Sequence, residues 1–149
     1  MSINLNEHTG VLIKKAARLF ERVSNLNLES LGVTYSQTIF LVRLWEQDGQ
    51  TQMELTKSSG LKQPTVVGIL NKMERDGLVI RFRSEEDKRC YHFFLTEKAK
   101  TACRQLEKQG DFMQKLATEH FCQDEVNNLN QNLMAVIENL QSFIDRVKV

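Results

Sequence analysis

The sequence predicts a mainly α-helical protein that carries a small two-stranded β-hairpin. Three observations support this fold class. Apolar residues recur at three- and four-residue steps along most of the chain, which is the period of a half-buried helix. One stretch in the middle instead alternates apolar with basic residues, as a half-buried strand does. One proline and seven glycines among 149 residues leave little room for long loops.

Composition narrows the class of protein. Hydrophobic residues make up 41% and charged residues 26% of the chain, which is ordinary for a globular domain with its own core. No apolar run is as long as a membrane span, and residues 1–10 lack the apolar segment of a secretory signal. Three cysteines without a CxxC pair argue against a disulfide framework or a zinc finger. We therefore expect one domain, 1–149, in the reducing cytoplasm, with no metal and no cofactor.

Two amphipathic helices are expected in the first third of the chain. Apolar residues at helical spacing predict the first over residues 7–27. Thr34 is a capping residue in front of a second apolar run, residues 39–45.

Two shorter helices follow, joined by a turn that contains a glycine. Thr51 stands three residues before Glu54, the spacing of a capping box, and predicts a helix over 52–59. Pro64, the only proline, lies where a first helical turn tolerates it, and Gly77 suits the end of that helix.

The hairpin is expected directly after these helices. Residues 79–83 alternate apolar and basic side chains, residues 84–89 are wholly polar, and residues 90–95 are again rich in strand-forming types. This order predicts two strands joined by a loop somewhat longer than usual.

Two long helices close the chain, one from Thr96 onward and one over 123–147. The last carries two apolar rows that repeat every seven residues, a pattern typical of helices that pack against other helices. The candidate interface residues in these rows are Val126, Leu129, Leu133, Val136, Leu140 and Phe143. We expect contacts with a second chain, while packing against the first helix of the same chain stays open.

Charge points to the middle of the chain as the part that meets a polyanion. Residues 62–104 carry ten basic and six acidic side chains, whereas residues 1–61 carry six of each and residues 105–149 carry four basic and seven acidic. Two short helices joined by a glycine-containing turn are the geometry of a helix-turn-helix, whose second helix enters the major groove of DNA. A merely solvated charged surface is the alternative.

The side chains of the second short helix and the hairpin suit DNA. Gln63 can bond to adenine, and Thr65 can contact a base or a phosphate. The other candidates on the helix are Lys62, Lys72 and Arg75 for phosphates and Asn71 on its outer face. The hairpin offers Arg81 and Arg83 along one strand face, Lys88 and Arg89 at its tip, and Asp87, which we expect to pair with Arg89.

Two stretches resemble the MarR family of winged helix-turn-helix transcription regulators, in particular its SlyA-like branch. They are LTKSSGLKQPTVVGILNKMERDGLV (55–79) and EEDKRCYHFFLTEKAK (85–100). The second contains the D-x-R signature of the wing, here 87–89, and the L-T-x-x-A entry to the next helix, here 95–99. The resemblance implies recognition contacts at Gln63, Pro64 and Thr65, and a wing contact by Arg89.

The same resemblance implies an assembly. A DNA-binding lobe over 34–95 would be flanked by dimerisation helices over 7–30 and 96–149, so that a homodimer straddles a pseudo-palindromic operator. Many members of the family release DNA when a small phenolic or carboxylate-bearing ligand binds. Family geometry suggests pocket walls at Leu12, Lys15, Ala16, Leu19, Phe40 and Arg43. Simple packing between helices is the alternative for these six residues.

Gly68 departs from the pattern of the family, and Cys90 suggests a second possible function, redox sensing. SlyA-like sequences commonly carry a base-reading Arg where this chain has Gly68, and glycine also costs about 1 kcal/mol of helix propensity. Asn71 and Lys72 are the candidates to take over that role. Some relatives sense peroxide through a cysteine in the first helix, but no cysteine precedes Cys90 here. Basic neighbours could lower the pKa of the Cys90 thiol, although a half-packed strand residue is the preferred interpretation.

Catalytic motifs are missing from the sequence, so an enzyme is not expected. The rival function is a winged-helix module that binds protein and not specific DNA, which Gly68 and the formal charge of +1 leave open. The sequence does not identify an operator, a ligand, or the choice between repression and activation.

Overall fold

The computed structural model describes residues 4–147, which fall into two compact units that are treated separately below. The first unit ends at Met113 and the second begins at Gln114, within α5. The helices are α1 (Thr9–Leu28), α2 (Tyr35–Glu46), α3 (Gln52–Ser59), α4 (Gln63–Arg75), α5 (Glu97–Ala117) and α6 (Gln123–Val147), with a short 3₁₀ turn η1 (Glu29–Leu31). The strands are β1 (Gln50–Thr51), β2 (Val79–Arg83) and β3 (Tyr91–Leu95). The mainly α class is therefore confirmed.

Local chemistry fixes where these helices begin and end. Thr34 and Gln37 form a reciprocal capping box at the start of α2, and Thr51 and Glu54 form another at the start of α3. Gly77 lies directly after α4 with φ of 70°, a left-handed conformation that ends the helix at little cost for glycine.

The sheet has three strands, whereas the sequence predicted two. β3 lies in the middle and pairs antiparallel with β2 from Val79↔Leu95 to Arg83↔Tyr91. Its other edge pairs with β1, at Gln50↔Phe93 and Thr51↔His92. A strand of two residues is too short to show alternating apolar and polar residues. β1 is therefore recognised only by its pairing with β3.

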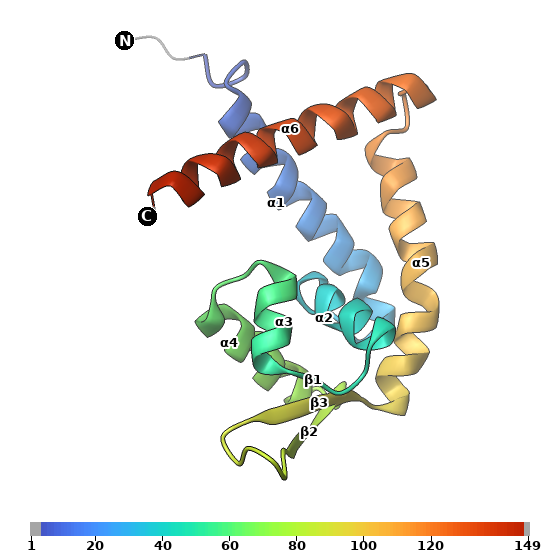
Figure 1. Ribbon diagram of the computed structural model, residues 1–149. Coiled ribbons are helices and arrows are strands. Elements are labelled where there is room, and N and C mark those ends of the chain that lie inside the picture. Colours follow the sequence, from blue (N-terminus) through green and yellow to red (C-terminus); the bar gives the residue numbers. More distant parts are fainter. Residues whose placement is uncertain (1–3, 148–149) are drawn as a thin grey trace. The chain divides into compact units, whose positions relative to one another are not determined.

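Helices α2, α3 and α4 lie together on one side of this sheet, and the β2–β3 hairpin extends beyond them (Figure 1). Apolar side chains from these elements and from the start of α5 form one core. Its fully buried members include Phe40, Leu44, Leu55, Leu70 and Met73. The core thus fixes the buried faces of α3 and α4 against the sheet and α2.

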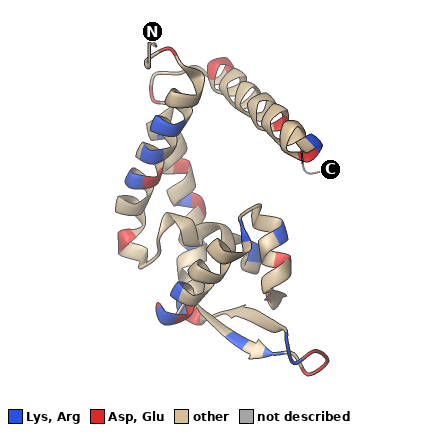
Figure 2. Cartoon of the chain, turned by 90° about the vertical axis from the view of Figure 1, so that its left-hand side faces the viewer, with Lys and Arg blue, Asp and Glu red and all other residues tan. Residues whose placement is uncertain are grey.

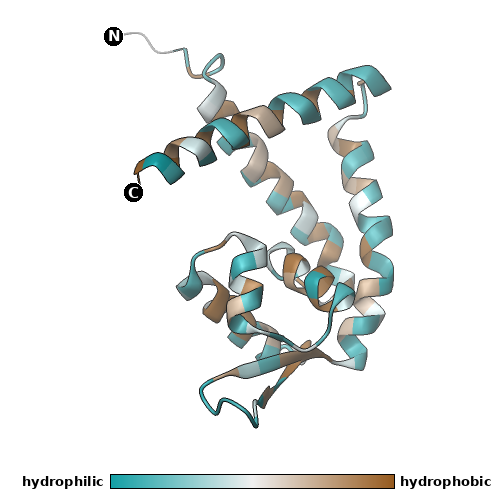
Figure 3. Ribbon diagram, viewed as in Figure 1, coloured by the Kyte–Doolittle hydropathy of each residue, from teal (hydrophilic) through white to brown (hydrophobic). Residues whose placement is uncertain are grey.

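The second unit contains the end of α5 and the whole of α6. Apolar and polar bands alternate along α6 (Figure 3). Both heptad rows predicted from the sequence fall within this helix, but none of its residues is buried within the chain. Leu140 and Phe143 are 62% and 59% exposed. Within residues 4–147, no helix has the length and apolarity to cross a membrane.

Candidate nucleic-acid interface

Helix α4 is held by one face and leaves the opposite face open. Val66, Leu70 and Met73 are buried against the core, at the three- and four-residue spacing of one helix face. The predicted contact residues of this helix are all exposed: Gln63, Pro64, Thr65, Asn71, Lys72 and Arg75. All six are therefore open to a partner, Gln63 at the first turn of the helix and the other five on the side opposite the buried residues. Their role in DNA binding stays a prediction.

The start of α4 is open to a partner. Lys62 occupies the N-cap position, but its side chain makes no capping hydrogen bond, and a proline follows in the first turn. The first backbone N–H groups of a helix have no partner within the helix and favour anions. The adjoining turn is compact, because Gly60 adopts a left-handed conformation with φ of 67° after α3.

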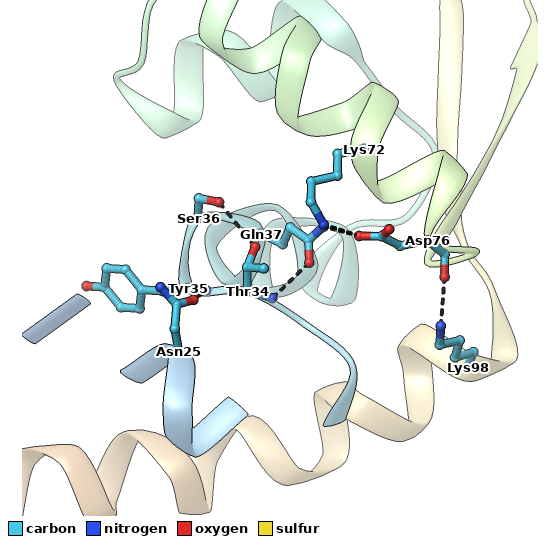
Figure 4. A network of polar contacts seen from close by, with 8 residues as sticks. All are labelled: Asn25, Thr34, Tyr35, Ser36, Gln37, Lys72, Asp76 and Lys98. Carbon is cyan, nitrogen blue, oxygen red and sulfur yellow. Dashed lines mark hydrogen bonds and ion pairs between the residues drawn. The ribbon is translucent and has the colours of Figure 1, made fainter. Parts of the chain in front are cut away.

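A polar clamp fixes the other end of α4 against α2 (Figure 4). Within this clamp the Asp76 carboxylate accepts hydrogen bonds from Gln37 Nε2 at 2.8 Å and from Lys72 Nζ at 2.7 Å. Lys98 Nζ donates to the Asp76 backbone carbonyl at 2.7 Å. Gln37 is fully buried, and its Oε1 accepts from the Thr34 N–H at 2.9 Å.

This Gln37–Asp76 clamp changes the expected role of Lys72. The bonds from Lys72 and Gln37 lower the pKa of the Asp76 carboxyl below its ordinary value, so the carboxylate stays charged. Lys72 thus already has an ion-pair partner, and a phosphate would have to compete with Asp76 for it. Sequence reasoning missed Gln37 entirely. The Thr34-x-x-Gln37 spacing, a capping box, was the signal that could have found its helix-start role.

The wing, defined here as β2, β3 and the loop 84–90, presents its charges at the tip. Figure 2 places basic and acidic segments together there. Lys88 and Arg89 are exposed and have no ion pair within residues 4–147. Arg81 and Arg83 are engaged within the chain. Arg81 Nε lies 3.2 Å from Glu74 Oε1, with the guanidinium 5.4 Å from the centre of the Tyr91 ring, and Arg83 Nε donates to the Lys88 carbonyl.

Asp87 organises the loop in a different way from the one expected. Its Oδ1 accepts from the backbone N–H of Arg89 at 2.9 Å, and its own N–H donates to Ser84 Oγ at 3.3 Å. The expected pairing of the Asp87 carboxylate with the Arg89 guanidinium is therefore replaced by a bond to the backbone. A carboxylate two residues before an N–H closes a local turn readily, which explains the difference.

The thiol of Cys90 shares that carboxylate. Its Sγ lies 3.5 Å from Asp87 Oδ2, and this hydrogen bond raises the pKa of the Cys90 thiol. The hypothesis that basic neighbours lower this pKa is wrong, because the nearest charge is the acidic one. The preferred alternative, a partly buried residue beside the strand, agrees with the structure.

His92 and Asp48 join the sheet to the helices. His92 Nδ1 lies 2.8 Å from the carbonyl oxygen of Gly49, and Asp48 Oδ1 accepts from the Leu95 N–H at 2.9 Å. Both contacts stabilise the turn before β1 and the middle strand β3. Within residues 4–147 no cluster of three or more His, Cys, Asp or Glu side chains could hold a metal ion.

The first unit contains a small pocket of about 230 Å³ between α1, α2 and α5. Its walls are Phe20, Ser24, Asn27, Leu28, Tyr35, Thr38, Val42, Leu106, Gln109, Gly110 and Met113. Ser24 Oγ and Asn27 Nδ2 are buried without a hydrogen-bond partner among the described residues. A wider groove of about 850 Å³ is lined partly by Arg18, Arg22 and Lys72.

None of the six pocket residues predicted from the sequence lines either cavity. Phe40 is fully buried in the core, so its prediction as a pocket wall is wrong. Leu12 and Leu19 are 44% and 53% exposed, and neither is among the walls of the small pocket. Helical spacing identified the apolar face of α1 but did not indicate which turn of that face meets α2.

Comparison with known proteins places this arrangement in a family. The MarR family model matches residues 33–91. The HTH-type transcriptional regulator MgrA of Staphylococcus aureus is 31% identical over 135 residues, which cover 90% of each chain. The uncharacterized HTH-type transcriptional regulator YybA of Bacillus subtilis is 26% identical over 132 residues, which cover 89% of this chain and 88% of that one. A mutant of MarR from E. coli, solved in complex with operator DNA, is 26% identical with a TM-score of 0.80 and covers 91% of this chain and 99% of that chain.

The Gln37–Asp76 clamp gives a prediction about stability. Asp76→Asn should lower the free energy of unfolding by about 1–2 kcal/mol at pH 7, because the charged partner of Lys72 and Gln37 is lost. A lowered folded-state pKa stabilises the protein above the ordinary value of 3.8, and the stabilisation disappears as pH falls through the folded-state pKa. Urea unfolding of both proteins from pH 7 to pH 3 checks this.

The control is Glu86→Gln, which neutralises an exposed carboxylate in the wing loop. It should leave the free energy of unfolding nearly unchanged across the same range. Equal effects of the two substitutions, or a difference between wild type and Asp76→Asn that grows toward pH 3, would contradict the role given to the clamp.

Proposed function

Because this chain belongs to the MarR family of winged-helix transcription regulators, we propose that it binds a specific double-stranded operator. Members of this family are not enzymes, and we place the binding in the cytoplasm. The DNA-bound form is a homodimer on a two-fold site. Helix α4 enters the major groove of each half-site, and the wing lies along the adjacent minor groove.

The observation that carries this proposal is that two surfaces of the first unit, one on α4 and one at the wing tip, are exposed. The core and the Gln37–Asp76 clamp hold α4 by its inner face and its far end, which leaves Gln63, Thr65 and Asn71 exposed. Lys88 and Arg89 are exposed at the wing tip of the same compact unit. Polar side chains beside unpaired cations are the combination that base edges and phosphates require. E. coli MarR, solved with operator DNA, supports the assignment by similarity.

Dimerisation follows from the apolar face of α6. Eight large apolar residues of this helix are at least 38% exposed, including Leu133, Leu140 and Phe143. A stripe of this length left in water favours association, and its heptad spacing suits helix–helix packing. A two-fold dimer would present two copies of α4 to half-sites about one helical turn, ~10 base pairs, apart.

We also propose that a small ligand controls DNA binding. The lining of the small pocket limits the chemical class of that ligand. Among residues 4–147, no charged side chain lines this pocket, whereas two aromatic rings and two unpartnered polar groups do. Its volume of about 230 Å³ suits a single-ring compound. A neutral phenol therefore fits better than a carboxylate, because a buried anion without a partner is costly. Binding would change DNA affinity if it prefers one arrangement of the helices around the pocket.

The DNA-binding part is tested by selecting duplexes from a random-sequence pool and measuring their affinity by fluorescence anisotropy at several salt concentrations. We expect selective binding that weakens steeply with salt, because cations displaced from phosphates drive it. Arg89→Ala should weaken binding about tenfold, whereas Arg104→Ala on α5 should not. Equal, weak affinity for selected and scrambled duplexes would instead favour a protein-binding module.

The dimer is tested by a double substitution on α6. Leu133→Asp with Leu140→Asp should yield a monomer in multi-angle light scattering, because two charges would be buried in the proposed interface. Gln131→Asp, on the polar side of the same helix, is the matched control and should remain dimeric. A wild-type monomer at micromolar concentration, or a dimer that survives the double substitution, would contradict the assignment of α6.

The pocket is tested with two probes of similar size, phenol and benzoate, in a thermal unfolding assay. Phenol should raise Tm more than benzoate does, and Ser24→Ala should weaken phenol binding about fivefold through the lost hydrogen bond. The control is Arg22→Ala in the wider groove, which should not affect phenol binding. Stronger stabilisation by benzoate, abolished in Arg22→Ala, would move the ligand site to that groove.

A further inference from the structure

Gly68 lies at the centre of the exposed face of α4. Successive residues of an α-helix are 100° apart, so positions 64, 65, 71, 72 and 75 all project within about 60° of position 68. The buried residues Val66, Leu70 and Met73 project to the opposite side. Position 68 therefore lies near the middle of the face of α4 that points away from the core.

Nothing inside the chain requires glycine at this position. A Cβ added to Gly68 would meet no neighbouring side chain or other segment within 4 Å. Gly68 is also not among the glycines with positive φ, so its conformation is one that any residue adopts. Glycine in the middle of a helix lowers stability relative to alanine, and the fold gains no contact in return.

Two polar neighbours of Gly68 on the exposed face, Thr65 and Asn71, have short side chains. Lys72 and Arg75 are longer, but Lys72 is held by Asp76 at 2.7 Å, and the flexible chain of Arg75 can extend toward the phosphates at the rim of the groove. A short side chain reaches a base edge only if the helix backbone lies close to the floor of the major groove. A long side chain at position 68 would hold the backbone away from that floor. Glycine permits the closest approach that a helix can make.

We propose that Gly68 determines specificity by letting α4 sit deep in the major groove, so that Thr65 and Asn71 contact base edges directly. The inference rests on the proposed function, since it concerns the same DNA-binding surface. Sequence selectivity here comes from depth of insertion, and not from a long base-reading side chain at the centre of the helix. Position 68 is then the site at which even one added methyl group acts on operator binding.

The experiment compares Gly68→Ala and Gly68→Leu with wild type, using the duplex that wild type selects from a random pool and a scrambled duplex. Gly68→Ala should raise Tm by about 2–4 °C and weaken binding to the selected duplex about tenfold. Gly68→Leu should weaken it further. Affinity for the scrambled duplex should stay within about twofold of wild type, because contacts with phosphates supply it.

The control is Thr101→Ala. Thr101 is exposed in the interior of another helix, α5, and its hydroxyl donates only within that helix, to the Glu97 carbonyl at 3.0 Å. Alanine has the higher helix propensity, so Thr101→Ala should raise Tm and leave both affinities unchanged.

Three outcomes would overturn the inference. Gly68→Ala could keep wild-type affinity and selectivity, which would mean that α4 does not approach DNA at this point. Thr101→Ala could lose as much affinity, which would mean that the effect comes from general helix stiffening. A wild-type protein that selects no sequence would remove the proposed function itself. Selective wild-type binding with an unaffected Gly68→Ala would remove only the role of Gly68.

Discussion

The structure depends on how α4 is held. Val66, Leu70 and Met73 anchor one face of this helix in the core, and the Gln37–Asp76 clamp fixes its end. A recognition surface must be rigid and also empty, because every intramolecular partner on it would have to be displaced by DNA. Anchoring by one face and one end meets both demands. The open N-terminus and the short side chains at the centre of the free face follow from the same constraint.

The wing and the terminal helices extend that principle. Asp87 fixes the loop backbone through its bond to the Arg89 N–H, which leaves the guanidinium without an ion-pair partner in the described chain. Within α6, none of the heptad-row residues is fully buried in the single chain, so the energy of their burial is available for association. In both places the chain satisfies its backbone locally and leaves exposed the side chains to which we assign function.

The sequence predicted every helix and both strands of the hairpin, because each has a local signal: a cap, a breaker or a period. It could not predict β1, whose two residues are defined only by pairing with β3. It also missed the clamp, since Gln37 and Asp76 are 39 residues apart and a buried glutamine has no local signature. The prediction of Phe40 as a pocket wall was wrong for a similar reason. Periodicity separates buried from exposed positions, but it does not separate core residues from residues that line a cavity. Exposure of the proposed DNA contacts agrees with the sequence reading, while their role stays a prediction.

The most direct test of the account is chemical interference on the duplex selected by the wild-type protein. Dimethyl sulfate methylates guanine N7 in the major groove and adenine N3 in the minor groove, so it probes α4 and the wing separately. We expect two zones of major-groove interference about 10 base pairs apart, each with minor-groove interference beside it. A single zone, or interference in the minor groove alone, would contradict the placement of α4 in the major groove of two half-sites.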